Sequence, residues 1–134
     1  MNMACHHIGI LTRNPKTLIS FYTQGLGFSE GETRILPADL TEKIFGLSSE
    51  CMLTKLTSGN AVIEIFAPVN IDVTRRNMGT AGYNHWALQV KNKESFIRIL
   101  EGRKVPVLKI DRAGRMVSFV KDPDGNLIEI YEVK

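Results

Sequence analysis

The sequence predicts an α+β fold built from two copies of a βαβββ module. The first observation is an internal repeat, because the stretch that begins at His7 returns at His85, and each histidine is followed seven positions later by an asparagine. The second is that each copy closes with a similar apolar strand, at 60–66 and 126–131. The third is a helical spacing of apolar residues after each asparagine. These three observations predict a duplicated unit.

The helix of each module is predicted from apolar residues spaced i, i+3 and i+4. They stand at equal offsets from the opening histidine in both copies: Leu18, Phe21 and Tyr22, then Phe96, Ile99 and Leu100. Asn14 followed by Pro15 favours a helix start, since Asn can accept from free N–H groups and Pro loses no bond at the first helical position. Gly25 and Gly102 are expected to end the helices.

Two further strands are expected in each module, between its helix and its closing strand. The segments suited to them are 30–36, 51–57, 104–110 and 115–121. The run from Asp122 to Asn126 favours a tight turn before the last strand, because it combines Pro with Asp-Gly. Residues 37–49 are extra to the first module and are expected to form a short helix or a lid. The predicted organisation is one domain, 1–134, with module one at 1–67, a linker at 68–82 and module two at 83–134.

Composition places the chain among ordinary globular proteins. Its 134 residues are 43% hydrophobic and 23% charged, and the net charge is +3. The basic residues are scattered, so no nucleic-acid partner is expected. No apolar run approaches the roughly 20 residues of a membrane span and the N-terminus lacks signal-peptide features, so we expect no membrane partner and a cytoplasmic location. Cys5 and Cys51 are too few for a disulfide scaffold and are expected to be reduced and to serve packing.

Alternation along four strands separates a helix-covered face from a second, lined face. The residues expected under the helices are Ile8, Ile10, Ile63, Ile65, Trp86, Leu88, Ile128 and Ile130. The other face then carries His7, Glu64, His85 and Glu129, each beside apolar or small residues. Taken singly, each is more simply a polar residue on a half-exposed sheet. Their recurrence at equivalent places in both copies favours a shared site.

Two imidazoles and two carboxylates of this kind predict a divalent metal site. Carboxylates that share a partly buried cavity repel each other unless a cation lies between them. Neutral imidazole and carboxylate are ligands of zinc, nickel, cobalt, manganese and ferrous iron, and the sequence does not select among these metals. By the same alternation His6 faces the helix side and is expected to be a core or rim residue. Cys5 shares the face of His7 at a strand end.

Three motifs resemble the vicinal oxygen chelate superfamily: His6 to Ile10, Tyr83 to Leu88, and Asp122 to Ile130. The resemblance covers nearly the whole chain. It implies the glyoxalase/bleomycin resistance/dioxygenase fold, in which two βαβββ modules form a cupped mixed sheet. Within the superfamily, the His/Glu/His/Glu set is similar to that of glyoxalase I. By position, this likeness implies the metal ligands His7, Glu64, His85 and Glu129.

The resemblance to glyoxalase I also implies a metal-dependent lyase or isomerase that acts on a small substrate with vicinal oxygens. A carbon acid would be deprotonated and a metal-bound enediolate would be stabilised by the cation. Glu129 is the expected general base, with Glu64 as the second choice. The residues expected to line the substrate pocket are Leu11, Val62, Phe66, Arg115, Leu127 and Tyr131.

Other functions within the superfamily remain open. An extradiol-type dioxygenase would use two histidines and one glutamate on iron, so a fourth ligand at Glu64 argues against it. A small-molecule binding or resistance protein would lack the ligands that this chain keeps. An epimerase of acyl-coenzyme A would usually carry Gln in place of Glu64.

The residues by which glyoxalase I holds glutathione are mostly absent. Leu11 stands where an Arg is expected and Pro68 where an Asn is expected, whereas Arg115 aligns with a basic residue that can meet the thiol's carboxylate. The sequence therefore predicts poor use of glutathione and a smaller or more apolar substrate. A homodimer is expected by analogy. Whether the site closes within one chain or between two swapped chains is left open by the sequence.

Overall fold

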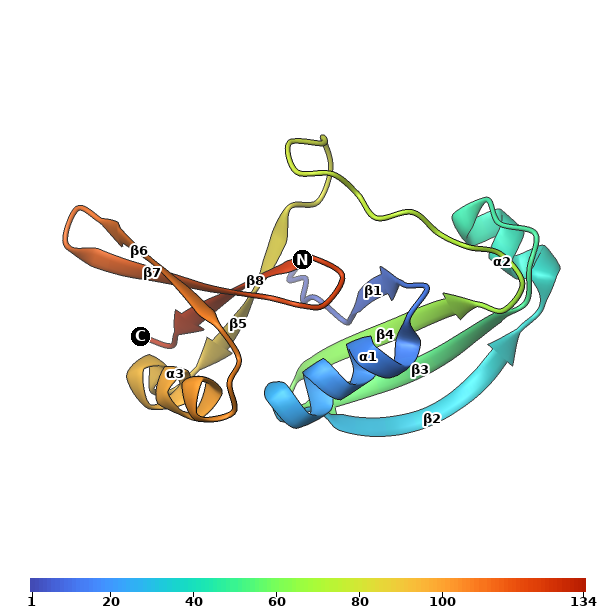
Figure 1. The fold of residues 1–134 in the computed structure, drawn as a ribbon. Coiled ribbons are helices and arrows are strands. Elements are labelled where there is room, and N and C mark those ends of the chain that lie inside the picture. The colour runs from blue at the N-terminus through green and yellow to red at the C-terminus, as the bar shows by residue number, and fades with distance from the viewer. The chain divides into compact units, whose positions relative to one another are not determined.

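The computed structural model describes residues 1–134 and divides them into two compact units, Met1–Arg75 and Arg76–Lys134. Each unit contains one four-stranded mixed sheet (Figure 1). The first unit is formed by β1 (Ile8–Leu11), α1 (Pro15–Ser20), a π-helical segment (Phe21–Gly25), β2 (Ser29–Leu36), α2 (Ala38–Phe45), β3 (Cys51–Ser58) and β4 (Ala61–Pro68). The second is formed by β5 (His85–Val90), α3 (Lys93–Gly102), β6 (Val107–Arg112), β7 (Arg115–Lys121) and β8 (Leu127–Glu132). The predicted α+β class with two βαβββ modules is confirmed.

The two sheets have the same topology. Their strand orders are β1-β4-β3-β2 and β5-β8-β7-β6. In each, the opening strand pairs in parallel with the closing strand, and the other pairs are antiparallel. Two parallel strands need a long crossover connection between them. In each module this connection starts with the helix that follows the opening strand. This topology places the opening strand beside the closing strand in both sheets.

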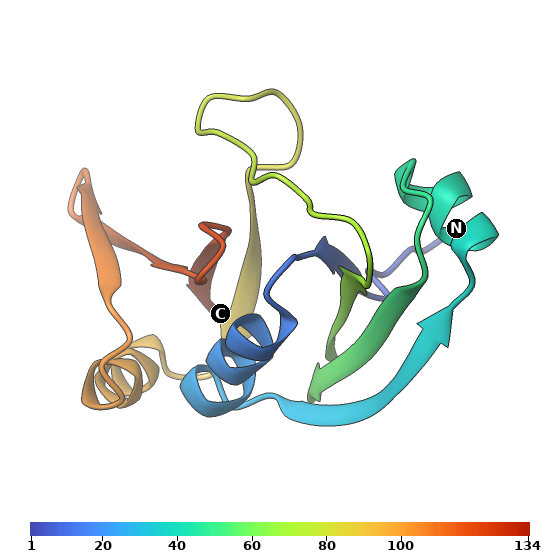
Figure 2. The same ribbon diagram turned by 45° about the vertical axis from the view of Figure 1, so that its right-hand side comes forward.

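The core of each unit lies between its helix and one face of its sheet. Helix α1 packs on β4, and α3 packs on β6 and β8, as Figures 1 and 2 show. The isoleucines of the closing strands, expected under the helices, are fully buried: Ile63, Ile65, Ile128 and Ile130. Trp86 and Leu88 are half-buried. Burial of these branched side chains is the main stabilising term in each unit.

The two helices begin differently although both follow an asparagine. Asn14 makes no side-chain cap, and instead Thr12 Oγ1 accepts from the Asn14 backbone N–H at 3.0 Å. The predicted capping by Asn14 is therefore wrong, because the buried Thr12 hydroxyl fixes this corner. Asn92 does cap its helix, since its Oδ1 accepts from the Ser95 N–H at 2.8 Å.

The helices end at Gly25 and Gly102, as predicted, and one predicted core residue is misplaced. In the first helix Leu18 and Tyr22 are fully buried. In α3, Ile97 and Leu100 are buried while Ile99 is 49% exposed. The prediction for Ile99 is wrong because it copied the offsets of the first helix, whereas α3 turns a different stripe toward its sheet.

Two connections have the expected character. The extra segment of the first module forms α2, which ends at Gly46 in the left-handed conformation that glycine favours, with φ 73°. The turn before β8 is organised by the buried Asp122 carboxylate, which accepts from the backbone N–H groups of Asp124 and Asn126 and from Asn126 Nδ2. Asp122 thus fixes the start of the strand that carries Glu129.

Predictions for the N-terminal segment need correction. Cys5 is exposed, so it has no packing role, whereas Cys51 is buried and its thiol pKa is raised by that burial. His6 lies before the first residue of β1 and is exposed, so strand alternation does not extend to it. Its Nδ1 lies 2.8 Å from Nδ1 of His7. No helix of the chain has the length and apolar character required to cross a membrane.

Candidate functional site

In the first unit, the structure brings His7 and Glu64 together. His7 directly precedes β1, and Glu64 of β4 pairs in register with Gly9 of β1. His7 Nε2 lies 2.9 Å from Glu64 Oε1. A Cβ at Gly9 would lie 3.3 Å from the Phe66 ring, so glycine leaves room for that ring beside the pair. The side chains of His7 and Glu64 are 41% and 19% exposed, which leaves the pair open to a small ligand.

In the second unit, His85 and Glu129 occupy the equivalent places. His85 opens β5, and Glu129 of β8 pairs with Ala87. His85 Nε2 lies 3.6 Å from Glu129 Oε2, and Asn84 Oδ1 lies 2.7 Å from His85 Nδ1. An amide oxygen can only accept, so this contact places a hydrogen on Nδ1. In the tautomer with its one hydrogen on Nδ1, Nε2 has the lone pair that a metal-binding imidazole uses.

Both pairs fit a divalent metal by distance and by chemistry. Two ligand atoms about 2.1 Å from one ion lie about 3.0 Å apart at a right angle and about 3.6 Å apart at roughly 120°. The observed separations of 2.9 and 3.6 Å match these values. The shorter distance also suits a direct hydrogen bond from His7 Nε2–H to Glu64 in the metal-free protein. Imidazole and carboxylate together are suitable ligands for several transition metals.

Each unit by itself offers a metal two ligands. In neither unit do three or more His, Cys, Asp or Glu side chains come together in a group that could hold an ion. The structure therefore brings His7 to Glu64 and His85 to Glu129. The sharing of one ion by both pairs stays a prediction.

The residues predicted to line a substrate pocket share the faces of these pairs. Along β1 and β4, the alternation puts Leu11, Val62 and Phe66 on the face of Glu64. Along β7 and β8, Arg115, Leu127 and Tyr131 share the face of Glu129, because Glu129 is opposite Phe119 and Leu127 is opposite His85. In the second unit the Phe119 ring also stands edge-on to His85, with centroids 5.2 Å apart. Their contact with a substrate stays a prediction.

A cavity of about 370 Å³ beside Glu64 contains residues that the sequence interpretation missed. It is lined by Glu32, Arg34, Leu53, Lys55 and Glu64. Lys55 is directly opposite Glu64 across the β3–β4 ladder, and Arg34 is opposite Leu53 across the β2–β3 ladder. Apolar and polar residues do not alternate along 51–57, so the sequence carries no signal for the face of Lys55, which follows only from the β3–β4 register. The register itself depends on the turn at Gly59 and Asn60.

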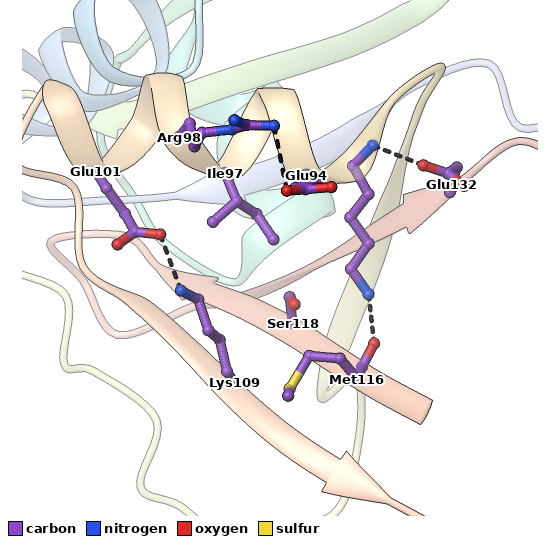
Figure 3. A pocket seen from close by; sticks show the side chains of 9 residues that line it. Glu94, Ile97, Arg98, Glu101, Lys109, Met116, Ser118 and Glu132 are labelled. Atoms are coloured by element: carbon purple, nitrogen blue, oxygen red, sulfur yellow. Dashed lines mark hydrogen bonds and ion pairs between the residues drawn. The ribbon is translucent and has the colours of Figure 1, made fainter. Parts of the chain in front are cut away.

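A second cavity, of about 470 Å³, lies on the helix side of the other sheet, between α3 and the strands below it (Figure 3). Its charged side chains are engaged with one another or with the backbone. Lys109 pairs with Glu101 at 2.9 Å and Arg98 with Glu94 at 3.2 Å. Lys93 Nζ donates to the Met116 carbonyl, and Glu132 accepts from the Lys93 backbone N–H. This cavity contains none of the predicted site residues.

Comparison with known proteins identifies the family of this arrangement. The sequence model of the Glyoxalase/Bleomycin resistance protein/Dioxygenase superfamily matches residues 4–130. This range includes both His–Glu pairs and every strand except the last two residues of β8. No curated protein sequence matches the chain.

Solved structures with the same fold include several from this group. A glyoxalase family protein from Enterococcus faecalis is 27% identical with a TM-score of 0.71, and the match covers 96% of this chain and 97% of that one. The trypanothione-dependent glyoxalase I of Leishmania major is 23% identical with a TM-score of 0.69, over 98% and 87% of the two chains. A lactoylglutathione lyase from Agrobacterium tumefaciens is 16% identical with a TM-score of 0.63, over 98% and 94%. At these lower identities the likeness shows the fold.

Proposed function

The chain belongs to the Glyoxalase/Bleomycin resistance protein/Dioxygenase superfamily, and we propose that it is a metal-dependent lyase or isomerase of glyoxalase type. In this proposal the two His–Glu pairs, His7 with Glu64 and His85 with Glu129, hold one divalent cation. The observation that carries it is the recurrence of the pair at equivalent strand positions in both sheets, with Nε2 facing a carboxylate oxygen each time. A chance polar pair on one sheet would have no reason to recur on the other.

The proposed substrate is a small molecule with two vicinal oxygens. When bound, the cation supplies Lewis-acid stabilisation of the negative charge that develops on those oxygens. Glu129 is the proposed general base, which takes a proton from the carbon next to a carbonyl and returns it to the neighbouring carbon. Asn84 holds the His85 ring through Nδ1, so that Nε2 stays directed at the site. The Phe119 ring makes a T-shaped contact with the same ring, with centroids 5.2 Å apart.

The proposal is tested first by elemental analysis of the purified protein and of His85→Ala. In the wild type we expect about one divalent ion for every two His–Glu pairs. In the variant we expect metal affinity to fall at least about tenfold. Glu101→Gln serves as the matched control, since it removes one charge from the same unit on the helix side. Metal content that is equal in His85→Ala and in the control would contradict the metal assignment.

A substrate screen separates the functional classes within the superfamily. Hemithioacetals test glyoxalase chemistry, catechols with oxygen test extradiol chemistry, and acyl-coenzyme A thioesters test epimerisation. We expect turnover only of substrates that isomerise without oxygen. Oxygen consumption with a catechol would replace the proposal with the dioxygenase. A metal-free protein that binds ligands without converting them would favour a binding or resistance protein.

Glutathione hemithioacetal is expected to be a poor substrate. Leu11 packs against the apolar cluster of Cys51, Leu53 and Phe66, so it cannot replace an arginine that holds a carboxylate. Each charged contact that is absent removes about 1.5–3 kcal/mol of binding free energy. A steady-state assay with methylglyoxal and glutathione on nickel-, cobalt- and zinc-loaded protein measures this. A kcat/KM of about 10⁴ M⁻¹s⁻¹ or more would show an ordinary glyoxalase I.

We also propose that the protein acts as a homodimer. Each sheet has two edge strands, β1 and β2 in one and β5 and β6 in the other, whose outer N–H and C=O groups lack a ladder partner. A C2 pair is the commonest way for a chain of this size to associate. Light scattering at micromolar concentration is expected to give twice the mass of 15.0 kDa. A stable monomer would remove this part of the proposal.

A further inference from the structure

Two cations beside Glu64 have no partner, and this sets their cavity apart from the other one. In the helix-side cavity, Lys93, Arg98 and Lys109 are all engaged by carboxylates or carbonyls (Figure 3). In the cavity beside Glu64, neither Arg34 nor Lys55 forms a side-chain hydrogen bond or an ion pair, although Glu32 and Glu64 line the same space. The positive charge in the cavity beside Glu64 is therefore available to a ligand.

The strand register explains why these cations stay unpaired. Lys55 lies directly across the ladder from Glu64, at a spacing where opposite charges usually meet. Glu64, however, is engaged by His7 at 2.9 Å. In the proposed function the same carboxylate also holds the metal, which neutralises it further. Lys55 thus stands beside a carboxylate that already has a close partner in His7.

Arg34 is held on the same face by an irregularity in β2. The ladder between β2 and β3 shifts register between Glu30 and Thr33. Gly31 makes this bulge possible, because a Cβ there would lie 3.0 Å from the Lys55 carbonyl oxygen. Beyond the bulge Arg34 is opposite Leu53, so Arg34 and Lys55 reach one cavity from neighbouring strands.

We propose that Arg34 and Lys55 form a carboxylate-binding subsite, and that the substrate of the proposed function is consequently a small organic acid. A planar guanidinium can hold a carboxylate with two parallel hydrogen bonds, and a lysine ammonium adds a further charge-assisted bond. Leu53 forms the apolar wall of the cavity beside them. The acid group occupies this subsite while the vicinal oxygens of the same molecule reach toward Glu64. The carboxylate-binding subsite stands by itself, and only the substrate class rests on the proposed function.

The subsite can be tested on metal-free protein, so that its failure is distinct from failure of the proposed function. The probe is succinate, and its neutral counterpart succinamide has nearly the same shape without charge. Binding is followed by NMR shifts of the Arg34 guanidinium and Lys55 ammonium groups during titration. We expect saturable shifts with succinate, with a Kd of about 1 mM, and at least about tenfold weaker binding of succinamide.

Charge-removing variants locate the binding. Arg34→Gln and Lys55→Met each remove one positive charge while keeping an unbranched side-chain stem, and each is expected to weaken succinate binding about tenfold or more, with unchanged circular dichroism. Lys109→Met is the matched control, because it removes a cation that is already paired with Glu101. It is expected to bind succinate as the wild type does.

Three outcomes would overturn the subsite: equal binding of succinate and succinamide, equal loss in Lys109→Met, or absence of saturable shifts. Inorganic phosphate is titrated in parallel, and tighter binding of phosphate than of succinate would reject the carboxylate assignment in favour of a phosphate ester. Metal content is measured in the same variants and is expected to stay unchanged. If the wild type holds no metal but binds succinate through Arg34 and Lys55, the subsite stands and the proposed chemistry falls.

Discussion

The two units have the same strand order and the same His–Glu placement, yet their side chains around the pair differ. Glu64 has Lys55 across the ladder, whereas Glu129 has Phe119 at the equivalent place. In the first unit Arg34 adds a second cation on the neighbouring strand, and the corresponding position of the second unit is Ile110, 43% exposed. At these two positions the first sheet is therefore charged, and the second is apolar or aromatic.

This difference separates residues that a common chemistry needs from residues that select a substrate. In the proposed function, the imidazole and the carboxylate recur because each unit would contribute the same two donors to the metal. The flanking positions lie on the same face of each sheet but carry different residue types, so they can differ between the two copies. We infer that the first sheet recognises charge while the second places an aromatic ring against His85. Variants that exchange or remove these features test the distinction.

The largest effect is expected from the two carboxylates. Glu129→Gln should lower turnover about a hundredfold or more, since the amide cannot accept the proton, and its buried neighbours Ile128 and Ile130 keep the strand in place. Glu64→Gln should lower metal affinity more than it lowers turnover of the fully loaded protein. The measurement is steady-state kinetics at saturating metal on the substrate that the screen identifies. Full activity in Glu129→Gln, with a hundredfold loss in Glu64→Gln, would move the base to the first unit.

A cation placed at the aromatic position should weaken metal binding. Phe119→Lys puts an ammonium where the ring now lies 5.2 Å from His85, and repulsion from a divalent ion is expected to lower affinity about tenfold or more. Phe119→Leu is the control, because it removes the ring without adding charge. Competition with a chelating dye measures both. Equal affinities for the Lys and Leu variants would show that charge around the second pair is unimportant.

The sequence predicts the strands well because repeat and alternation are local properties. The intervals 51–57 and 115–121 agree with β3 and β7 to within a residue. The sequence also places His7 and Glu64 on one face, and the parallel pairing of β1 with β4 in the structure brings them side by side. Arg34 and Lys55 could not be found in this way, because their shared face depends on the β2 bulge and on cross-strand register, which are tertiary properties.

Other errors have the same origin in tertiary structure. Ile99 was predicted to be buried because its offset in the repeat matches that of Phe21. In the structure, Ile97 and Leu100 are the residues of α3 that are buried. Asn14 was predicted to cap its helix because of its residue type. In the structure, the buried Thr12 hydroxyl accepts from the Asn14 backbone N–H instead. Local propensity thus identified the elements, and tertiary packing determined which residue of each element is buried or forms the cap.

A smaller effect is expected from the residue that holds the His85 ring. Asn84→Ala removes the acceptor at 2.7 Å from Nδ1, so the ring can turn and the hydrogen can move to Nε2. We expect metal affinity to fall about tenfold, at the lower end of the usual effect of such partners. Asn84→Asp keeps an oxygen acceptor and should restore affinity, which a merely structural role for Asn84 would not predict. His6→Ala should have less effect, because water can reach the 41% exposed His7 side chain.

The smallest expected effect compares the two repeated asparagines. Asn92 Oδ1 accepts from the Ser95 N–H at 2.8 Å, so Asn92→Ala should lower the free energy of unfolding by about 1 kcal/mol. Asn14 makes no such bond, and Asn14→Ala should cost only a few tenths of a kcal/mol on the same scale. Thermal melts would show about 4 °C for the first variant and little change for the second. A matching shift for both variants would mean that Asn14 stabilises its helix by a contact other than capping. Thr12→Val then completes the comparison, since it removes the hydroxyl that accepts from the Asn14 N–H at 3.0 Å and should destabilise the first unit more than Asn14→Ala does.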